Sequence, residues 1–185
     1  MKKLFAFLLL AAGLVSCSSC VKKDQPPVDA SVPAPTPSVD AAAPAPVTAT
    51  FSVDNLSITM PGPGWVPQVL DPHMFKVGGA MPLLNEALQN ASILAKEETV
   101  ASYDEYIIAN VRAVKTAGAN VHSTKQVVVN GHKFVLIESS RDNLHVWTWV
   151  TLEKGFGYNF SCGGPVGKTN QQDLCLGISN TLKIN

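Results

Sequence analysis

The protein has 185 residues with 14 basic and 14 acidic side chains, so its formal net charge is zero. Only 15% of the residues are charged, and such a chain lacks the basic surface that binds nucleic acid, so we expect no nucleic-acid partner. Residues 51–185 are long enough to enclose a hydrophobic core by themselves. The sequence therefore predicts one folded domain with additional segments before it.

Residues 1–16 have the pattern of a secretory signal peptide. Two lysines precede an apolar run from Leu4 to Val15, which is too short to span a bilayer as a helix. The run ends in Leu14-Val15-Ser16-Cys17, which resembles the bacterial lipobox. The resemblance implies cleavage before Cys17 and acylation of the new N-terminal cysteine, for example with palmitate, which anchors the chain to a membrane. The alternative is an ordinary secretory signal in which Cys17 is incidental.

Residues 17–50 are predicted to be a lipidated cysteine followed by a disordered tether. The segment from Val21 to Thr50 contains seven prolines and no glycine, leucine, isoleucine or aromatic residue, so it cannot bury enough apolar surface to fold. Its prolines favour an extended spacer, although Pro33–Pro37 could also serve as a proline-rich ligand. Ser18, rather than an aspartate, follows Cys17, so in a cell with two membranes we expect the periplasmic side of the outer membrane.

The folded domain is predicted to begin with extended chain. Residues 51–60 alternate between apolar and polar but break at Asp54-Asn55, which favours a short hairpin or a bulged strand. The segment Pro61-Gly62-Pro63-Gly64-Trp65 predicts a turn, with Trp65 closing the core at this corner. Residues 66–77 favour a second extended piece. Residues 78–90 favour a short helix or a loop because Pro82 interrupts their apolar spacing, and residues 91–97 predict a strand.

The clearest helix is predicted over residues 103–117. Ser102 and Glu105 form a capping box, in which a hydroxyl at the N-cap is followed three residues later by a carboxylate. An apolar stripe then follows at helical spacing, and Gly118 is a typical C-terminal glycine. The stripe consists of Tyr103, Ile107, Val111 and Val114. Arg112 and Lys115 are expected on the solvent side.

A four-stranded antiparallel meander is predicted from Val121 to Cys162. Turn signals at Asn130-Gly131, Arg141-Asp142-Asn143 and Lys154-Gly155 separate four apolar runs. With Arg141-Asp142 as the second loop, Glu138 faces His145. Both faces of this sheet are apolar, so both need a cover. One face carries Val127, Val129, Phe134, Leu136, Trp147, Trp149, Tyr158, Phe160 and Cys162, and the other carries Val128, Val135, Ile137, Val146, Val150 and Leu152.

The last part of the chain is predicted to be a helix over residues 169–180 and a short strand over residues 181–184. Thr169 and Gln172 form a possible second capping box. Cys175 in this helix and Cys162 in the sheet are the only cysteines inside the domain, and an exported chain permits a disulfide between them. No CxxC spacing or histidine cluster favours a metal or redox pair instead, so we expect no metal and no cofactor.

Glu138 and His145 are the candidate acid–base pair. A carboxylate facing an imidazole can transfer protons, but a cross-strand ion pair on the surface has the same appearance. The nearby Ser139 and Ser140 are not part of a GxSxG nucleophile motif. Gly167-Lys168-Thr169 lacks the earlier glycine of a phosphate-binding loop, although a bare helix N-terminus there could bind an anion.

The domain resembles the PsbP-like family, which also includes DcrB-type bacterial lipoproteins and a eukaryotic Ran-binding import factor. The resemblance rests on Pro61–Trp65, the helix after Ser102, the Asn130-Gly131-His132 hairpin and Gly157-Tyr158-Asn159-Phe160. It implies an α+β fold in which an antiparallel sheet lies between helices, and a binding or assembly subunit rather than an enzyme. We therefore expect a lipid-anchored envelope protein with a protein partner, the alternative being a small-ligand-binding or hydrolytic module that uses Glu138 and His145.

Overall fold

The computed structural model describes residues 48–68, 79–168 and 170–185. The predicted signal peptide, Cys17 and nearly all of the predicted tether lie outside the described residues, as does Thr169. No helix among the described residues is long and apolar enough to cross a membrane. The elements in chain order are β1 (Thr48–Val53), β2 (Leu56–Pro61), β3 (Val66–Pro67), β4 (Gly79–Asn85), β5 (Asn90–Glu98), α1 (Tyr103–Thr116), β6 (Asn120–Val129), β7 (His132–Arg141), β8 (Leu144–Glu153), β9 (Phe156–Pro165), α2 (Gln171–Ser179) and β10 (Lys183–Ile184).

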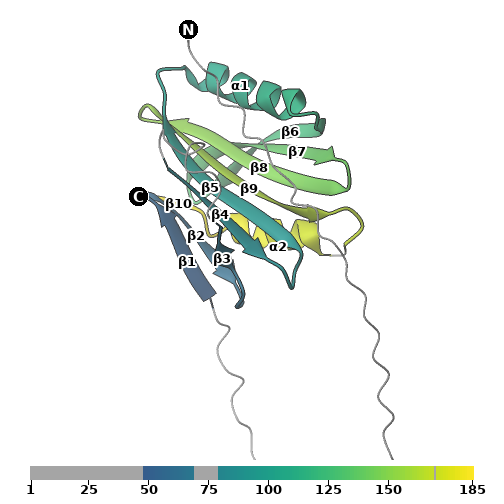
Figure 1. Ribbon diagram of the computed structural model, residues 1–185. Coiled ribbons are helices and arrows are strands. Elements are labelled where there is room, and N and C mark those ends of the chain that lie inside the picture. The colour runs from purple at the N-terminus through teal and green to yellow at the C-terminus, as the bar shows by residue number, and fades with distance from the viewer. Residues whose placement is uncertain (1–47, 69–78, 169) are drawn as a thin grey trace, which may run out of the picture. The chain divides into compact units, whose positions relative to one another are not determined.

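The strands form two antiparallel sheets (Figure 1). The larger sheet has the strand order β3-β4-β5-β9-β8-β7-β6, and the smaller one has the order β1-β2-β10. The strands β6 to β9 are the predicted meander. The hairpin β4–β5 joins the same sheet through β5 and β9, which are separated in the chain by α1 and the other three meander strands.

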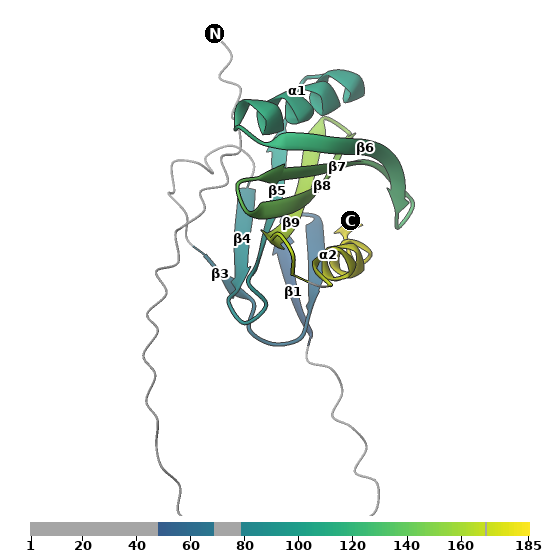
Figure 2. The same ribbon diagram turned by 90° about the vertical axis from the view of Figure 1, so that its right-hand side faces the viewer.

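Both faces of the larger sheet are covered, but by different layers (Figure 2). The helix α1 covers one face over β6, β7 and β8, and a small core there includes Tyr106, Ile137 and Val150. The helix α2 and the small sheet cover the other face and enclose the main core. In this core the rings of Trp149 and Phe160 stack with their centroids 5.3 Å apart. The predicted fold class is confirmed. The three-stranded sheet beside α2 is an addition that the sequence pattern did not predict.

Two of the three predicted turns have the expected register, and the second is shifted. Val129 pairs with His132 and Trp149 pairs with Phe160, which is the register that two-residue loops at Asn130-Gly131 and Lys154-Gly155 produce. At the second turn Arg141 pairs with Leu144, so the loop is Asp142-Asn143. The φ angle of Asp142 is 53°, a left-handed conformation that aspartate adopts more readily than arginine.

The register shift does not move any side chain to the other face, because it is an even number of residues. The predicted main-core face is confirmed, with Trp147 and Trp149 only 4% and 1% exposed. On the α1 face, Val135, Ile137 and Val150 are buried as predicted, whereas Val128 on the edge strand is 69% exposed. The direct partner of Glu138 becomes Trp147, and the direct partner of His145 becomes Ser140.

Residues 79–85 form the strand β4, so the prediction of a helix or loop there was wrong. Pro82 pairs with Ile93 of β5, and its carbonyl oxygen accepts a hydrogen bond from the backbone N–H of Gln68. In an antiparallel strand the nitrogen and the carbonyl oxygen of one residue point to the same side. The missing N–H of Pro82 therefore points toward the short strand β3, and its pairing with β5 loses no hydrogen bond.

The other N-terminal predictions are confirmed where the chain is described. Residues 51–60 fall in a hairpin whose loop is Asp54-Asn55, and residues 91–97 lie in β5. Trp65 is 7% exposed in the main core, and its indole donates a hydrogen bond to the Pro61 carbonyl at 3.1 Å. Of the predicted piece 66–77, residues 69–77 lie outside the described residues, and the first two of its three described residues form β3.

The helix α1 has the predicted capping box at its first turn. The Ser102 hydroxyl accepts the backbone N–H of Glu105, and the Glu105 carboxylate accepts the backbone N–H of Ser102 at 2.9 Å. Its most buried residue is Tyr106, which the predicted stripe omitted. The Tyr106 ring lies against Gly157 of β9 in the space that any Cβ atom at Gly157 would occupy. The contact could not be predicted from apolar periodicity, because Gly157 has no side chain and therefore contributes nothing to such a pattern.

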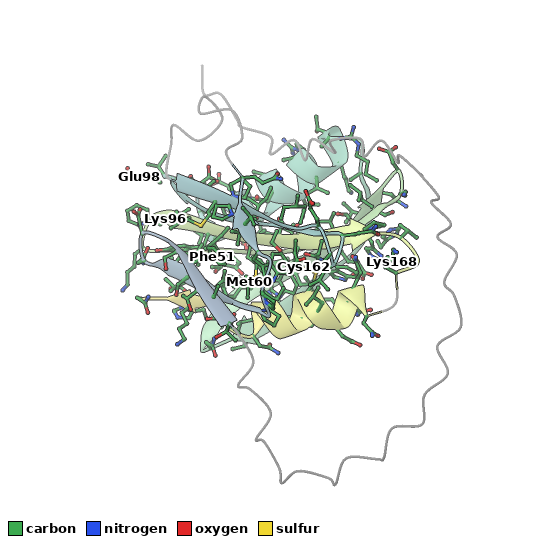
Figure 3. The ribbon with its side chains drawn as sticks, turned by 60° about the horizontal axis from the view of Figure 1, so that its bottom comes forward. Phe51, Met60, Lys96, Glu98, Cys162 and Lys168 are labelled. Atoms are coloured by element: carbon green, nitrogen blue, oxygen red, sulfur yellow. A yellow bond between two sulfur atoms is a disulfide. The ribbon has the colours of Figure 1, made fainter. Side chains whose placement is uncertain are left out.

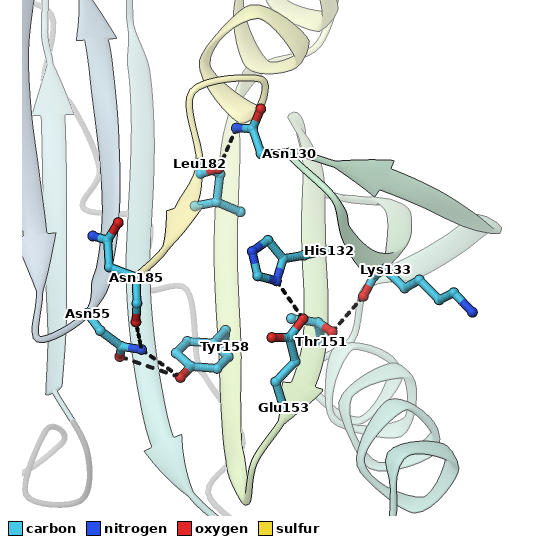
Figure 4. A network of polar contacts seen from close by, with 9 residues as sticks. All are labelled: Asn55, Asn130, His132, Lys133, Thr151, Glu153, Tyr158, Leu182 and Asn185. Carbon is cyan, nitrogen blue, oxygen red and sulfur yellow. Dashed lines mark hydrogen bonds and ion pairs between the residues drawn. The ribbon is translucent and has the colours of Figure 1, made fainter.

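Polar contacts hold the end of the chain against the domain (Figure 4). The Asn130 side chain donates a hydrogen bond to the carbonyl oxygen of Leu182 at 2.8 Å, which Figure 4 shows. It donates another to the carbonyl oxygen of Asn180 at 3.0 Å. The Asn55 side chain donates to the carbonyl oxygen of Asn185 at 2.9 Å and to the Tyr158 hydroxyl at 3.1 Å. The C-terminal strand β10 is therefore held by two turns that are distant in the chain.

Candidate functional site

A disulfide joins Cys162 of β9 to Cys175 of α2, which is the predicted pair. Both cysteines are fully buried, and their Cα atoms are 5.5 Å apart. Figure 3 shows α2 alongside the sheet where Cys162 is labelled. Asn90 of β5 is also fully buried, and its amide nitrogen lies 3.8 Å from the Cys175 sulfur. The covalent bond therefore fixes the middle of α2 on the main-core face.

The structure brings Glu138 and His145 together, although they are diagonal rather than direct cross-strand neighbours. The His145 Nε2 atom lies 3.1 Å from the Glu138 Oε1 atom, and each side chain is a little under one third exposed. The second carboxylate oxygen of Glu138 accepts a hydrogen bond from the Ser123 hydroxyl at 3.1 Å. The His145 imidazole stacks on the Trp147 ring with the ring centroids 4.3 Å apart. Both oxygens of the carboxylate are thus already engaged.

A second histidine extends this polar cluster. His122 contacts the Ser140 hydroxyl at 2.7 Å, and its ring meets the His145 ring edge-on at 5.7 Å. A hydrolytic triad needs one histidine between a nucleophile and a carboxylate. Among the described residues the serine and the carboxylate of this cluster contact different histidines, so the arrangement is an ion-pair and hydrogen-bond network without a triad. The described residues also contain no group of three potential metal ligands.

The histidine of the predicted pair borders a pocket, but the carboxylate does not. The pocket has a volume of about 310 Å³ and lies between the end of β9 and the start of α2. His145 and Trp147 contribute to its wall, whereas Glu138 is absent from the lining. A catalytic role for the pair requires both side chains to reach one substrate. The geometry therefore favours His145 alone as a wall residue of this pocket.

A larger groove lies between α1 and the edge strand β6. Its volume is about 530 Å³, and the described residues that line it include three basic side chains and no acidic one. Ile108 contributes an apolar side chain that is 57% exposed. The other lining residues are Ile107, Val111, Arg112, Lys115, Thr124, Lys125, Gln126 and Val135. This groove was not predicted from the sequence. The adjacent residues Ile107 and Ile108 could have indicated it, because two neighbouring positions of a helix cannot both lie in one buried stripe, so one isoleucine is exposed.

The strand that borders this groove has an open edge. Among the described strands only β7 pairs with β6, which ends the seven-stranded sheet. Its ten residues are mostly exposed or half-buried. An edge strand of this length presents backbone N–H and C=O groups to which an extended peptide can add.

The arrangement of layers defines a PsbP-like α+β fold. No protein-family model matches the sequence, and no curated protein sequence matches it. The chain is similar to the solution structure of cyanobacterial PsbP (CyanoP) from Synechocystis, with a TM-score of 0.59 and 12% sequence identity over 80% of this chain and 98% of that one. This likeness shows the fold.

Two further solved structures are similar over part of their length. One is a protein from Bacteroides thetaiotaomicron, with a TM-score of 0.49 and 14% identity, covering 74% of this chain and 48% of that one. The other is a protein of unknown function from Pseudomonas aeruginosa, with a TM-score of 0.43 and 8% identity, covering 70% of this chain and 91% of that one.

Proposed function

We propose that the protein is a non-catalytic lipoprotein of the bacterial cell envelope whose domain binds a protein partner or supports envelope assembly. In this proposal Cys17 carries the lipid, and residues 18–47 tether the domain to the periplasmic side of the outer membrane, because residues 48–50 of the predicted tether belong to β1. The observation that carries the binding role is the groove between α1 and β6, which combines exposed apolar side chains with an unbalanced positive charge.

The chemistry of the groove indicates what the partner presents. Arg112 and Lys115 from α1 and Lys125 from β6 contribute the positive charges, and within the described residues none of the three forms an ion pair. Ile108 and Val111 add apolar surface between them. An extended segment with alternating acidic and apolar side chains complements this lining, and its backbone can add to the edge of β6.

In-cell photocrosslinking tests the partner site. A benzophenone amino acid replaces Ile108 in one variant of the full chain and Leu88 in another. Leu88 is the matched control because it is 43% exposed but lies in the β4–β5 turn, away from the groove. We expect one discrete envelope-protein adduct from position 108 and none from position 88. The adduct should disappear when Arg112→Glu and Lys115→Glu are added, because reversing charge repels an acidic partner.

Two results would contradict the partner site: equal adducts from both positions, or an adduct that persists after charge reversal. The lipid anchor is tested separately with Cys17→Ala and metabolic labelling by a palmitate analogue. Labelling should be lost in this variant and retained in Cys20→Ala, because only Cys17 ends the lipobox-like sequence. Continued labelling of the Cys17→Ala chain would show that the anchor lies elsewhere.

A further inference from the structure

The pocket at the start of α2 is separate from the groove that carries the proposed function. It is formed by the start of β8, the end of β9 with the loop that follows it, and the first turn of α2. Figure 3 shows Lys168 on the loop that leads into this helix. The volume of about 310 Å³ lies at the lower end of the size range of small-molecule sites.

The first turn of α2 offers backbone donors to this pocket. The first hydrogen bond within the helix runs from the N–H of Leu174 to the carbonyl of Asn170, so the N–H groups of Gln171, Gln172 and Asp173 have no acceptor inside the helix. Asn170 occupies the N-cap position but makes no side-chain capping hydrogen bond. These three residues line the pocket, where the positive end of the helix dipole favours an anionic group.

An independent feature of the pocket is the side chain of Gln171. This residue is only 7% exposed, and its Oε1 atom has no hydrogen-bond partner among the described residues. The amide lies flat against Gly164 of β9, in the space that any Cβ there would occupy. A buried amide oxygen without a donor costs free energy. A ligand that brings an N–H group into the pocket would supply the missing donor.

The two charged side chains of the lining have opposite signs. Lys168 contributes a positive charge and Asp173 a negative one. A ligand with a single negative charge would be attracted by the helix terminus and repelled by the Asp173 carboxylate. Val166, which is 58% exposed, and the His145 ring provide less polar wall. The lining therefore combines donors and a cation for a carboxylate, acceptors for an ammonium group, and an apolar wall.

We propose that this pocket binds a small zwitterion that carries a carboxylate and an ammonium group, of which a free amino acid with an apolar side chain is the simplest example. The carboxylate interacts with the first turn of α2 and Lys168, and the ammonium group with the Asp173 carboxylate and the Gln171 oxygen. The disulfide to Cys175 holds the helix against the sheet, which keeps the pocket assembled before a ligand arrives.

Calorimetry on the full chain in detergent micelles tests this site with the twenty standard amino acids as probes. We expect at least one apolar amino acid to bind saturably below about 10 mM. Its N-acetyl derivative, which lacks the ammonium group, and its methyl ester, which lacks the carboxylate, should each bind about tenfold more weakly. No saturable binding by any amino acid, or equal binding of the free amino acid and both derivatives, would overturn the proposal.

Two charge variants assign the ends of the ligand. Asp173→Asn should remove most of the preference for the free amino acid over its N-acetyl derivative, because the variant no longer offers a carboxylate to the ammonium group. Lys168→Gln should reduce the preference for the free amino acid over its methyl ester, because the variant no longer offers a positive charge to the carboxylate of the ligand. The control Lys183→Gln changes an exposed lysine of β10 outside the pocket and should leave both preferences unchanged.

Gln171→Met removes the amide while keeping the length of the side chain. We expect weaker binding of the free amino acid with a melting temperature that is no lower than that of the original protein, because the variant also removes the unpaired buried oxygen. Unchanged affinity in a folded variant would count against the site. Arg112→Glu changes the groove and should not affect amino-acid binding. The zwitterion site and the proposed partner site can therefore fail separately.

Discussion

The side-chain amide of Asn130 donates a hydrogen bond of 2.8 Å to the carbonyl oxygen of Leu182. The same amide reaches the carbonyl oxygen of Asn180 at 3.0 Å, where α2 ends. Asn130 also adopts a φ angle of 49° in the turn between β6 and β7. One residue therefore closes a hairpin and holds the C-terminal segment, and only the first of these roles follows from its place in an Asn-Gly turn.

Asn130→Gly separates these two roles. Glycine adopts the positive φ angle without strain, so the turn itself should be preserved or improved. The loss of both hydrogen bonds should lower the free energy of unfolding by about 1–2 kcal/mol. Urea denaturation measures the change, and unchanged or increased stability would show that the amide contributes nothing beyond the turn.

The disulfide is expected to contribute to stability mainly by restricting the unfolded chain. Its cysteines are 13 residues apart, and the chain-entropy model gives about 3 kcal/mol for a loop of this length. Reduction under native buffer conditions should lower the denaturation midpoint accordingly. The double variant Cys162→Ala/Cys175→Ala is the control, because it should be less stable from the start and insensitive to the reductant.

Gly157 and Gly177 should respond to alanine with opposite signs. A Cβ atom at Gly157 would overlap with the buried Tyr106 ring, so Gly157→Ala should destabilise by about 1–3 kcal/mol. Nothing lies within 4 Å of a Cβ atom at Gly177 inside α2, so Gly177→Ala should stabilise by about 0.5–1 kcal/mol. Parallel denaturation curves give both values, and a shift of the same sign in both variants would contradict the packing.

The stability of the domain should fall in alkaline solution because of Tyr106. Burial raises the pKa of its phenol above the ordinary value of 10.0, and the neighbouring Glu97 carboxylate raises it further. The unfolded chain then releases this proton at a lower pH than the native protein. The contribution is complete below pH 10.0 and is lost as the pH rises above that value, by up to about 1.4 kcal/mol per pH unit.

Denaturation between pH 8 and about pH 11 checks this prediction. Tyr106→Phe should flatten the alkaline decline, because the variant has no phenol to ionise at that position. Burial also raises the pKa of Tyr103, which should leave a smaller residual slope in the variant. An identical decline in both proteins would assign the alkaline sensitivity to other groups.

The strands and the faces of the meander were predictable because their signals are local. Asn130-Gly131 and Lys154-Gly155 mark two-residue loops, and the alternation of apolar residues assigns each side chain to a face. The second turn could be formed by either of two overlapping dipeptides, Arg141-Asp142 or Asp142-Asn143. The prediction used the first, and the predicted register of β7 and β8 was therefore shifted. The choice depended on which residue tolerates a positive φ angle, and that residue is Asp142.

The candidate sites were less predictable because they depend on proximity between distant segments. The groove needs the outer face of α1 beside β6, and the pocket needs the start of α2 beside His145 and Gly164. The solvent-facing positions of Arg112 and Lys115 and a bare helix N-terminus near Lys168 were predictable from local patterns. The unpaired oxygen of Gln171 was not predictable, because its burial depends on packing against another strand.

The sequence by itself determined the four strands of the meander, the first helix, the two apolar faces and the pair Cys162–Cys175. Each of these depends on periodicity, on turn chemistry or on having only one possible partner inside the domain. Only the tertiary structure decided that β4 is a strand despite Pro82, that a second sheet joins α2 as a cover, and that Glu138 and His145 do not share one pocket. Those outcomes depend on which segments pack together, since burial and long-range pairing override the local preferences of the chain.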